Sequence, residues 1–132
     1  MEYQQIIKAI KAADEAITSE DFDALMEFYA DDAALVIKPG LIAKGKENIR
    51  KAFVAIADYF GHNLVVKQGE IQVIQGANTA LVIMETILET VDSKGVQART
   101  TRRATYVFRE ELDGKWLCVV DNSYGTDLLG VA

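Results

Sequence analysis

The chain has 132 residues, half of them hydrophobic, and this length predicts one domain spanning residues 1–132 with a single core. Twenty acidic residues against fourteen Lys and Arg give a formal charge of −6, which argues against nucleic acid and anionic membrane surfaces as partners. A lone cysteine, Cys118, and an N-terminus without a basic region or apolar run predict a cytoplasmic protein with no membrane span.

The apolar residues of the N-terminal part recur at helical intervals. Residues 2–18 carry them at steps of three and four, which predicts an amphipathic helix with Asp14 on its polar side. A second amphipathic helix is expected to follow, with Tyr29 at its end. Asp31 and Asp32 come next, and we expect them to terminate this helix.

A short strand and a third helix come next in the sequence. Residues 33–37 form an apolar run of strand length that stops at Pro39-Gly40, a dipeptide that favours a turn. Residues 46–60 again repeat apolar positions at helical intervals. Gly61 follows directly and is a typical C-terminal helix cap.

After His62 the pattern is that of a β-sheet. Val, Ile, Thr and aromatic residues predominate in four segments separated by turn residues, namely 63–75, 79–91, 96–110 and 115–124. We expect long antiparallel strands joined by hairpins, with a bulge at Gly69. Helices followed by long strands predict an α+β fold in which helices cover one face of a curved sheet.

Several short motifs occur in one order along nearly the whole chain: Ser19-Glu20-Asp21-Phe22, Phe28-Tyr29-Ala30-Asp31-Asp32-Ala33, Pro39-Gly40, Gly45-Lys46-Glu47-Asn48-Ile49 and Gly114-Lys115-Trp116. Together they resemble the NTF2-like superfamily, and within it the SnoaL-like and DUF4440-type branch. The resemblance implies a cystatin-like cone with three N-terminal helices on a strongly curved antiparallel sheet. It further implies a homodimer through the sheet and a mostly apolar cavity, but no single activity, because this fold hosts isomerases, cyclases, hydrolases and binding modules.

Ketosteroid isomerase resembles the chain through the same Asp-Asp-Ala turn and helix order. Its chemistry needs a carboxylate base, a tyrosine and a protonated acid. Alignment on the shared turn puts Ile37 at the position of the base, Ala13 at that of the tyrosine and Ala104 at or near that of the acid. Aliphatic side chains cannot transfer protons, so we expect that the protein is not a ketosteroid isomerase.

The last hairpin supplies candidate polar residues for a pocket. A two-residue turn at Asp113-Gly114 would make Tyr106 face Asp121 across the ladder and would leave Trp116 on the opposite side of the sheet from Asp121. The predicted cross-strand pairs on the pocket face are Phe108–Val119, Tyr106–Asp121 and Ala104–Ser123.

Asp121 is the leading candidate for a functional residue. Burial beside Tyr106 would raise the pKa of its carboxyl and make it a candidate base, acid or ligand anchor. The alternative is a structural role, in which Asp121 accepts hydrogen bonds from Tyr106, Ser123 or backbone amides.

Other candidates lie on neighbouring elements. Glu85 is expected near Arg102 or Arg103, and only one of the two arginines can face the cavity. Such a pair could clamp a carboxylate ligand or form an ordinary exposed ion pair. Tyr29 and Tyr59 could place hydroxyls at the cavity mouth or serve as core aromatics with a solvated tip.

Metal and nucleotide sites are not indicated. One His and one Cys provide no metal-ligand spacing, and the sequence contains no phosphate-binding glycine-rich loop, so we expect no metal and no cofactor. A Ser123–His62–Asp121 triad is conceivable, but no nucleophile elbow supports it.

Two functions stay open at this point, both using the same pocket. The first is a protein that binds a small apolar or amphipathic molecule, with Asp121, Tyr106, Ser123 and an arginine fixing its orientation. The alternative is a SnoaL-like enzyme that performs acid/base chemistry on a small carbonyl or polyketide-like compound, with Asp121 as the proton-transfer group. A third possibility is a structural dimerisation domain whose interior is filled by side chains.

Overall fold

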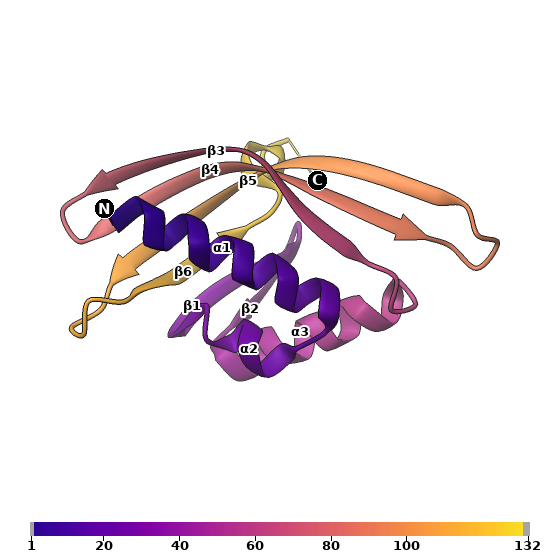
Figure 1. Ribbon diagram of the computed structural model, residues 1–132, viewed down its shortest axis with the longest axis horizontal. Coiled ribbons are helices and arrows are strands. Elements are labelled where there is room, and N and C mark those ends of the chain that lie inside the picture. Colours follow the sequence, from indigo (N-terminus) through magenta and orange to yellow (C-terminus); the bar gives the residue numbers. More distant parts are fainter. Residues whose placement is uncertain (1, 131–132) are drawn as a thin grey trace.

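The computed structural model describes residues 2–130 and places the helices on one face of a curved sheet (Figure 1). The α+β class expected from the sequence is confirmed. The helices are α1 (Glu2–Ser19), α2 (Phe22–Met26), α3 (Lys46–Tyr59) and the 3-10 helix η1 (Gly125–Leu128). The strands are β1 (Tyr29–Lys38), β2 (Leu41–Lys44), β3 (Val65–Gly76), β4 (Thr79–Val91), β5 (Gln97–Glu110) and β6 (Trp116–Asn122).

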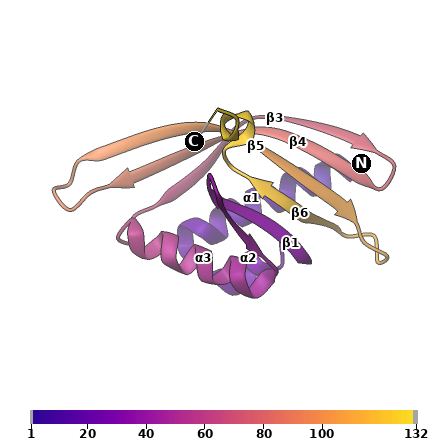
Figure 2. The same cartoon turned by 180° about the vertical axis from the view of Figure 1, so that it is seen from behind.

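The strands form a six-stranded sheet in the order β2-β1-β6-β5-β4-β3. Neighbouring strands are antiparallel except β1 and β6, which lie side by side and run parallel (Figure 2). The hairpin of β4 and β5 projects beyond the helices (Figure 1), and residues 97–101 at its far end are exposed. Because β1, the first strand in the chain, pairs with β6, the last, the N- and C-terminal parts of the chain share one core.

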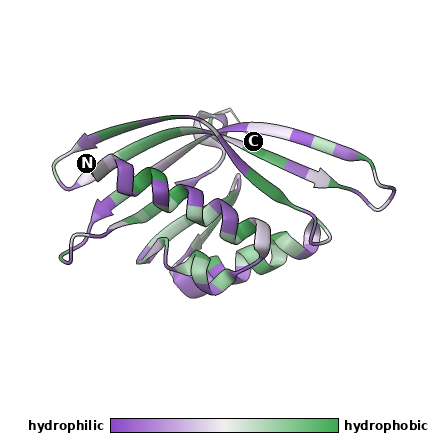
Figure 3. Cartoon of the chain, viewed as in Figure 1, coloured by the Kyte–Doolittle hydropathy of each residue, from purple (hydrophilic) through white to green (hydrophobic). Residues whose placement is uncertain are grey.

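Helix α1 packs its apolar stripe on the inner face of the sheet. Ile6 and Ile10 are fully buried, and apolar and polar residues alternate around the helix (Figure 3). Helix α3 ends as predicted at Gly61, which has a φ of +61°. The amide of the following His62 donates to the carbonyl of Ala57 at 2.9 Å, which completes a Schellman-type cap. Within residues 2–130, no helix has both the length and the hydrophobicity needed to cross a bilayer.

The segment from Tyr29 to Ala33 differs from the prediction. It begins β1 instead of ending a helix, so Asp31 and Asp32 lie within a strand. Against β6, this strand advances from Tyr29 to Ala34 while its partner advances only from Cys118 to Val120. The surplus residues form a wide irregularity that turns both aspartates toward solvent.

Strand β3 contains the bulge expected at Gly69, because its register with β4 shifts between Gln68 and Ile71. A side chain at Gly69 would begin 3.0 Å from Cβ of Glu85, so glycine allows the two strands to approach closely. Strand β5 then pairs with β4 in continuous register, in which Glu85 faces Arg103.

The turn between β5 and β6 is longer than predicted. The amide of Glu111 donates to the carbonyl of Lys115 at 2.7 Å, so the loop contains three residues and ends at Gly114 with a φ of +86°. Phe108 therefore pairs with Cys118, and the predicted pairing with Val119 is wrong.

A bulge at Val119 then restores the predicted pairing of Tyr106 with Asp121. Because of this bulge, Trp116 faces the same side as Asp121. Trp116 is only 5% exposed, and its expected place on the outer face is wrong.

Candidate functional site

Asp121 lies on the inner face of β6 and is buried, with 6% of its surface exposed. The hydroxyl of Tyr29 donates a hydrogen bond of 2.6 Å to its Oδ2. Burial raises the pKa of Asp121 from 3.8 to about 6, although the bond from Tyr29 opposes this rise. Near pH 6 this carboxyl is therefore about half protonated in the folded protein, and at pH 7 most of it is ionised.

Asp14 is a second buried carboxyl that the sequence prediction placed on the polar side of α1. It is 7% exposed, and its Oδ2 has no hydrogen-bond partner among residues 2–130. Burial, the charge of Asp121 and then the charge of Glu15 raise the pKa of Asp14 to about 7. The spacing contained a signal, because Ile10 and Ile17 lie four residues before and three after Asp14 on the inward stripe.

Aromatic rings pack beside Asp121. Phe28 makes edge contacts with Tyr29, Tyr106 and Phe108, at centroid distances of 5.0, 6.3 and 5.4 Å. Burial and then the charge of Asp121 raise the pKa of Tyr29 and of Tyr106 well above 10. Both phenols therefore stay protonated, and the hydroxyl of Tyr29 uses its hydrogen in the bond to Asp121.

Cys118 adjoins this group on the inner face of β6. Its thiol donates to the carbonyl of Val120 at 3.3 Å. Burial, followed by the charge of Asp121, raises the pKa of the thiol well above 9. The thiol is therefore a neutral wall of the site and lacks the thiolate character of a reactive cysteine.

The structure decides which arginine faces inward. Arg102 shares the inner face of β5 with Tyr106 and is half-buried, whereas Arg103 points outward. The Arg102 guanidinium carbon lies 4.3 Å from the centre of the Tyr124 ring, and its Nε has no partner within residues 2–130. Thr86 pairs with Arg102 in the ladder and is buried, with its hydroxyl beside the phenol of Tyr106.

Four predicted pocket residues do not lie where the sequence placed them. Glu85 points to the outer face opposite Arg103 and accepts a hydrogen bond from the amide of Glu70 at 3.2 Å, so its inward placement is wrong. Tyr59 is 83% exposed on α3, away from any interior site. Ser123 follows the end of β6 and is half-buried, so the predicted pair with Ala104 is absent from the ladder. Tyr29 lies deep in the core and not at a cavity mouth.

A small hollow opens between α1, α3 and the start of β3. Its space is about that of one water molecule, and its walls are Ile17, Glu20, Phe22, Phe53, Ile56, Ala57, His62 and Leu64. His62 lies at its rim, where Nδ1 contacts Glu20 at 2.8 Å and Nε2 contacts Asp58 at 3.2 Å. The bond to Glu20, supported by the charges of both acids, raises the pKa of His62. With both ring nitrogens engaged there, the conceivable triad with Ser123 and Asp121 is not formed.

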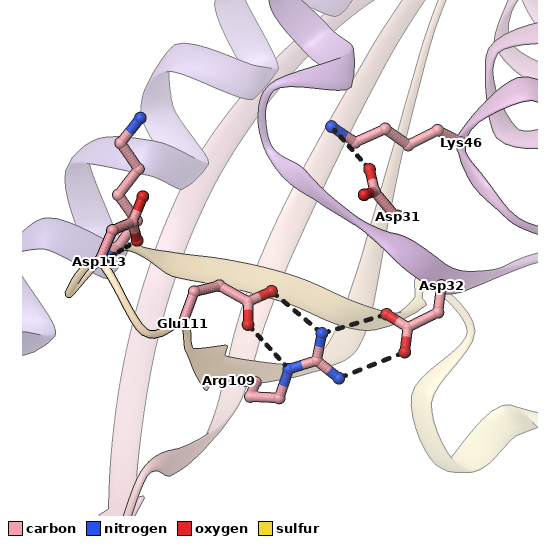
Figure 4. A network of polar contacts seen from close by, with 7 residues as sticks. Asp31, Asp32, Lys46, Arg109, Glu111 and Asp113 are labelled. Atoms are coloured by element: carbon pink, nitrogen blue, oxygen red, sulfur yellow. Dashed lines mark hydrogen bonds and ion pairs between the residues drawn. The ribbon is translucent and has the colours of Figure 1, made fainter.

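Asp31 and Asp32 make surface ion pairs. Lys46 lies 3.6 Å from Asp31, and Arg109 bridges Asp32 and Glu111 at 3.1 and 3.0 Å (Figure 4). Their carboxylates therefore belong to the outside of the molecule. Among the residues described, no cluster of three or more His, Cys, Asp or Glu has an arrangement suited to a metal ion.

The three positions that align with the catalytic residues of ketosteroid isomerase carry aliphatic side chains. Ala13 on α1 and Ala104 on β5 are both buried among core residues, and Ile37 packs against the same core. Neither alanine can donate a proton to a substrate oxygen. Asp14, the neighbour of Ala13, is the polar group that α1 contributes instead.

A family model and several solved structures match this chain. Residues 6–120 match the model of a family described as SnoaL-like domain, whereas no curated protein matches the chain. Aln2 from a Streptomyces species has a similar structure, with a TM-score of 0.79 at 13% identity over 91% of this chain and 87% of that chain. An NTF2-like protein with a cystatin-like fold from Novosphingobium aromaticivorans gives 0.76 at 20% identity over 98% and 90%.

A third similar structure is the association domain of C. elegans CaMKII. Its TM-score is 0.71 at 19% identity, with 90% of this chain and 92% of that chain covered. At such identities these likenesses establish the NTF2-like, cystatin-like fold, and the activities of the other proteins are not transferred with it.

Proposed function

Because the chain belongs to the SnoaL-like domain family, whose model matches residues 6–120, we propose that it binds a small apolar or amphipathic molecule. The binding site lies between the helices and the inner face of the sheet, where Asp121 is the polar anchor. The observation that carries this proposal is a buried carboxyl that, within residues 2–130, accepts one side-chain hydrogen bond, from Tyr29. A carboxyl with free acceptor capacity in an aromatic surrounding is suited to orient a ligand.

The neighbours of Asp121 would complete the site. Tyr106 lies across the ladder as a protonated phenol, and Arg102 lies further along the same face, where its Nε has no partner in the described part of the chain. The hollow beside Phe53 has room for about one water molecule, so a larger ligand requires the surrounding side chains to move. Ligand binding is therefore expected to rearrange the interior, with Ile17 and Phe53 as the first side chains to shift.

The second candidate function is acid/base chemistry on a small carbonyl or polyketide-like compound, with Asp121 as the proton-transfer group. Asp14 favours it, because two buried carboxyls with pKa values of about 6 and about 7 can exchange protons near neutral pH. A single titratable group would serve as an anchor, whereas a pair can hold one proton and accept another.

We further propose that the protein forms a homodimer through the outer face of the sheet. Ile74, Leu81, Val107 and Val120 form a row across β3, β4, β5 and β6 on that face. An apolar row with partly exposed side chains supports an interface, as does the shared fold with an association domain. Light scattering is expected to give a dimer mass and Leu81→Asp a monomer mass; a monomeric wild type at high concentration would contradict this. Cytoplasmic location stays a prediction.

Native mass spectrometry of the purified protein, followed by identification of any retained molecule, tests the main proposal. The identified molecule is then offered to the wild type, to Asp121→Asn and to the surface control Asp31→Asn. Weaker binding to Asp121→Asn alone supports the anchor, and loss of turnover at retained affinity supports the enzyme. Equal binding and turnover by all three proteins would exclude both roles for Asp121.

A further inference from the structure

Asp14 on α1 and Asp121 on β6, two elements that are in contact, form an interior acid pair that has no cationic partner within residues 2–130. We propose that the ligand carries a protonated amine that bonds to the carboxylates of both residues. This inference rests on the proposed small-molecule site and names the chemical class of its ligand. A buried carboxylate without a cation is costly, so a site built around two of them is complementary to a positive group.

The ion pairs of the described chain lie at the surface. Lysine and arginine side chains pair there with Asp23, Asp31, Asp32, Glu47, Glu89 and Glu111. None of these cations reaches Asp14 or Asp121. Arg102 faces inward, but its guanidinium stacks on Tyr124 and makes no ion pair with either acid. The two interior carboxyls are therefore left without the positive charge that the surface acids have.

Unused acceptors in the same interior match the donors of an ammonium group. Oδ2 of Asp14 is buried and unpartnered among residues 2–130, and within the same residues the carboxyl of Asp121 accepts one side-chain hydrogen bond, from Tyr29 to Oδ2. Thr86, which is 5% exposed on the inner face of β4, places its hydroxyl beside the phenol of Tyr106. A primary ammonium has three donors and no acceptor, whereas a carboxylate ligand would add a third negative charge.

The aromatic surround is suited to the same group. Tyr106 and Phe108 lie 6.3 Å apart between ring centres, and Phe28 packs edge-on against both. Ring faces attract desolvated cations, and the attraction is largest where water is excluded. The formal charge of −6 adds a long-range field that concentrates cations near the protein.

Two residues that line the hollow between α1 and α3 lie next to neighbours of the acid pair. Its wall residue Ile17 lies one helical turn after Asp14 on the same stripe of α1. The ring centre of its wall residue Phe53 lies 6.2 Å from that of Tyr29, and the hydroxyl of Tyr29 donates a hydrogen bond to Asp121. Glu20 at the rim is acidic as well, although His62 partly offsets its charge.

Binding of an ammonium should release protons. The ligand-free pair reduces its charge by holding protons, as the raised pKa values of about 7 and about 6 indicate. The other groups facing it are Glu15, which is exposed, and the phenols of Tyr29 and Tyr106 and the thiol of Cys118, which stay protonated. Near pH 6.5 a bound cation displaces protons from the two carboxyls.

The test uses matched probes: benzylamine, neutral benzyl alcohol and anionic benzoate, with methylamine and propylamine as smaller amines. Calorimetric titrations at pH 6.5 in two buffers of different ionisation enthalpy give affinity and proton release together. We expect an amine to bind at least ten-fold more tightly than the alcohol, benzoate not to bind, and proton release to be measurable. This measurement uses the unmodified protein and does not depend on the folding of a variant.

Asp14→Asn and Asp121→Asn should each lower amine affinity at least ten-fold, whereas Asp31→Asn, an exposed acid, should leave it unchanged. Circular dichroism checks that each variant folds. If benzyl alcohol or benzoate binds as tightly as the amines, or if no amine binds at millimolar concentration, the inference is overturned. Retention of a neutral molecule anchored by Asp121, seen by native mass spectrometry, would overturn it while leaving the proposed function intact.

Discussion

The substitution Asp14→Asn tests whether the interior holds a carboxyl against its tendency to ionise. Burial, the charge of Asp121 and the charge of Glu15 raise the pKa of Asp14 from 3.8 to about 7 in the folded protein. Between these values the folded state keeps a proton that the unfolded state has lost, so stability falls as pH rises through this window and levels off above it. At about 1.4 kcal/mol per pKa unit, the loss attributable to Asp14 is about 4 kcal/mol.

Asparagine cannot ionise, so the variant should lack this loss. We expect Asp14→Asn to be about 2 to 4 kcal/mol more stable than the wild type at pH 8. The difference in free energy of unfolding between the two proteins should increase by a similar amount from pH 4.5 to pH 8. The constant cost of burying an amide affects every pH equally, which makes the change of the difference with pH the diagnostic quantity. Urea denaturation at pH 4.5, 6 and 8, extrapolated to water, gives the free energies of unfolding.

The design separates Asp14 from other titrating groups. His62, whose pKa is raised by Glu20, also loses stabilisation as pH rises through its folded pKa, but it does so equally in both proteins. Asp31→Asn is the matched control, because that carboxylate is exposed and pairs with Lys46 at 3.6 Å, so its effect should stay within about 1 kcal/mol. A difference between Asp14→Asn and the wild type that stays flat from pH 4.5 to 8 would refute the reasoning.

Two further substitutions probe the hydrogen bond to Asp121 and a close backbone approach. Tyr29→Phe removes the 2.6 Å donor to Asp121 and should destabilise the protein by about 1 to 3 kcal/mol. The hydrogen bond from Tyr29 lowers the pKa of Asp121, so its removal should raise that pKa further. Carboxyl NMR titration measures the change, and an unchanged or lower pKa would contradict the prediction. Gly125→Ala should cost about 2 kcal/mol or more, since φ is +54° and a Cβ would lie 2.1 Å from the carbonyl oxygen of Arg103. Gly76→Ala is the control, because a Cβ at Gly76 would have no atom within 4 Å, and it should cost less than about 1 kcal/mol. Equal losses of stability at both glycines would show that the close approach at Gly125 is not the cause.

Elements with strong local periodicity were predictable from the sequence. The bounds of β4 agree with the prediction, and α1 and α3 agree within about a residue, because a long run of apolar positions fixes each of them. The start of β1 was missed because Tyr29 pairs with Cys118, a residue far along the chain, and no local pattern reports such a parallel pairing. Local propensity near Asp31 and Asp32 instead favoured a helix end.

The acid pair was half predictable. Asp121 was found through strand alternation, whereas Asp14 was assigned to solvent because carboxyls are rarely buried. Its spacing from Ile10 and Ile17 indicated the buried stripe, but the residue type outweighed the spacing. For the arginines, alternation limited the inward position to Arg102 or Arg103, and the register with Thr86 was needed to decide between them.

The inward position of Asp121 was predicted from a register in which two differences cancel. The turn is one residue longer than expected, and Val119 is one unpaired residue in β6, so Tyr106 still meets Asp121. Deletion of Val119 distinguishes this register from the regular ladder. With the bulge, the shortened strand becomes regular and keeps Cys118 and Asp121 inward; without a bulge, the same deletion would turn Asp121 outward.

We therefore expect the Val119 deletion to fold, at a cost of about 1 to 2 kcal/mol for the lost half-buried side chain. The pKa of Asp121 should stay raised, near about 6, in carboxyl NMR titration. Deletion of Leu117 is the control, because it puts Trp116 and Cys118 on opposite faces. Exposing the indole, at about 25 cal/mol per Å² over roughly 200 Å², costs about 5 kcal/mol. An ordinary pKa for Asp121 after deletion of Val119 would mean that the bulge does not determine which way this carboxyl faces.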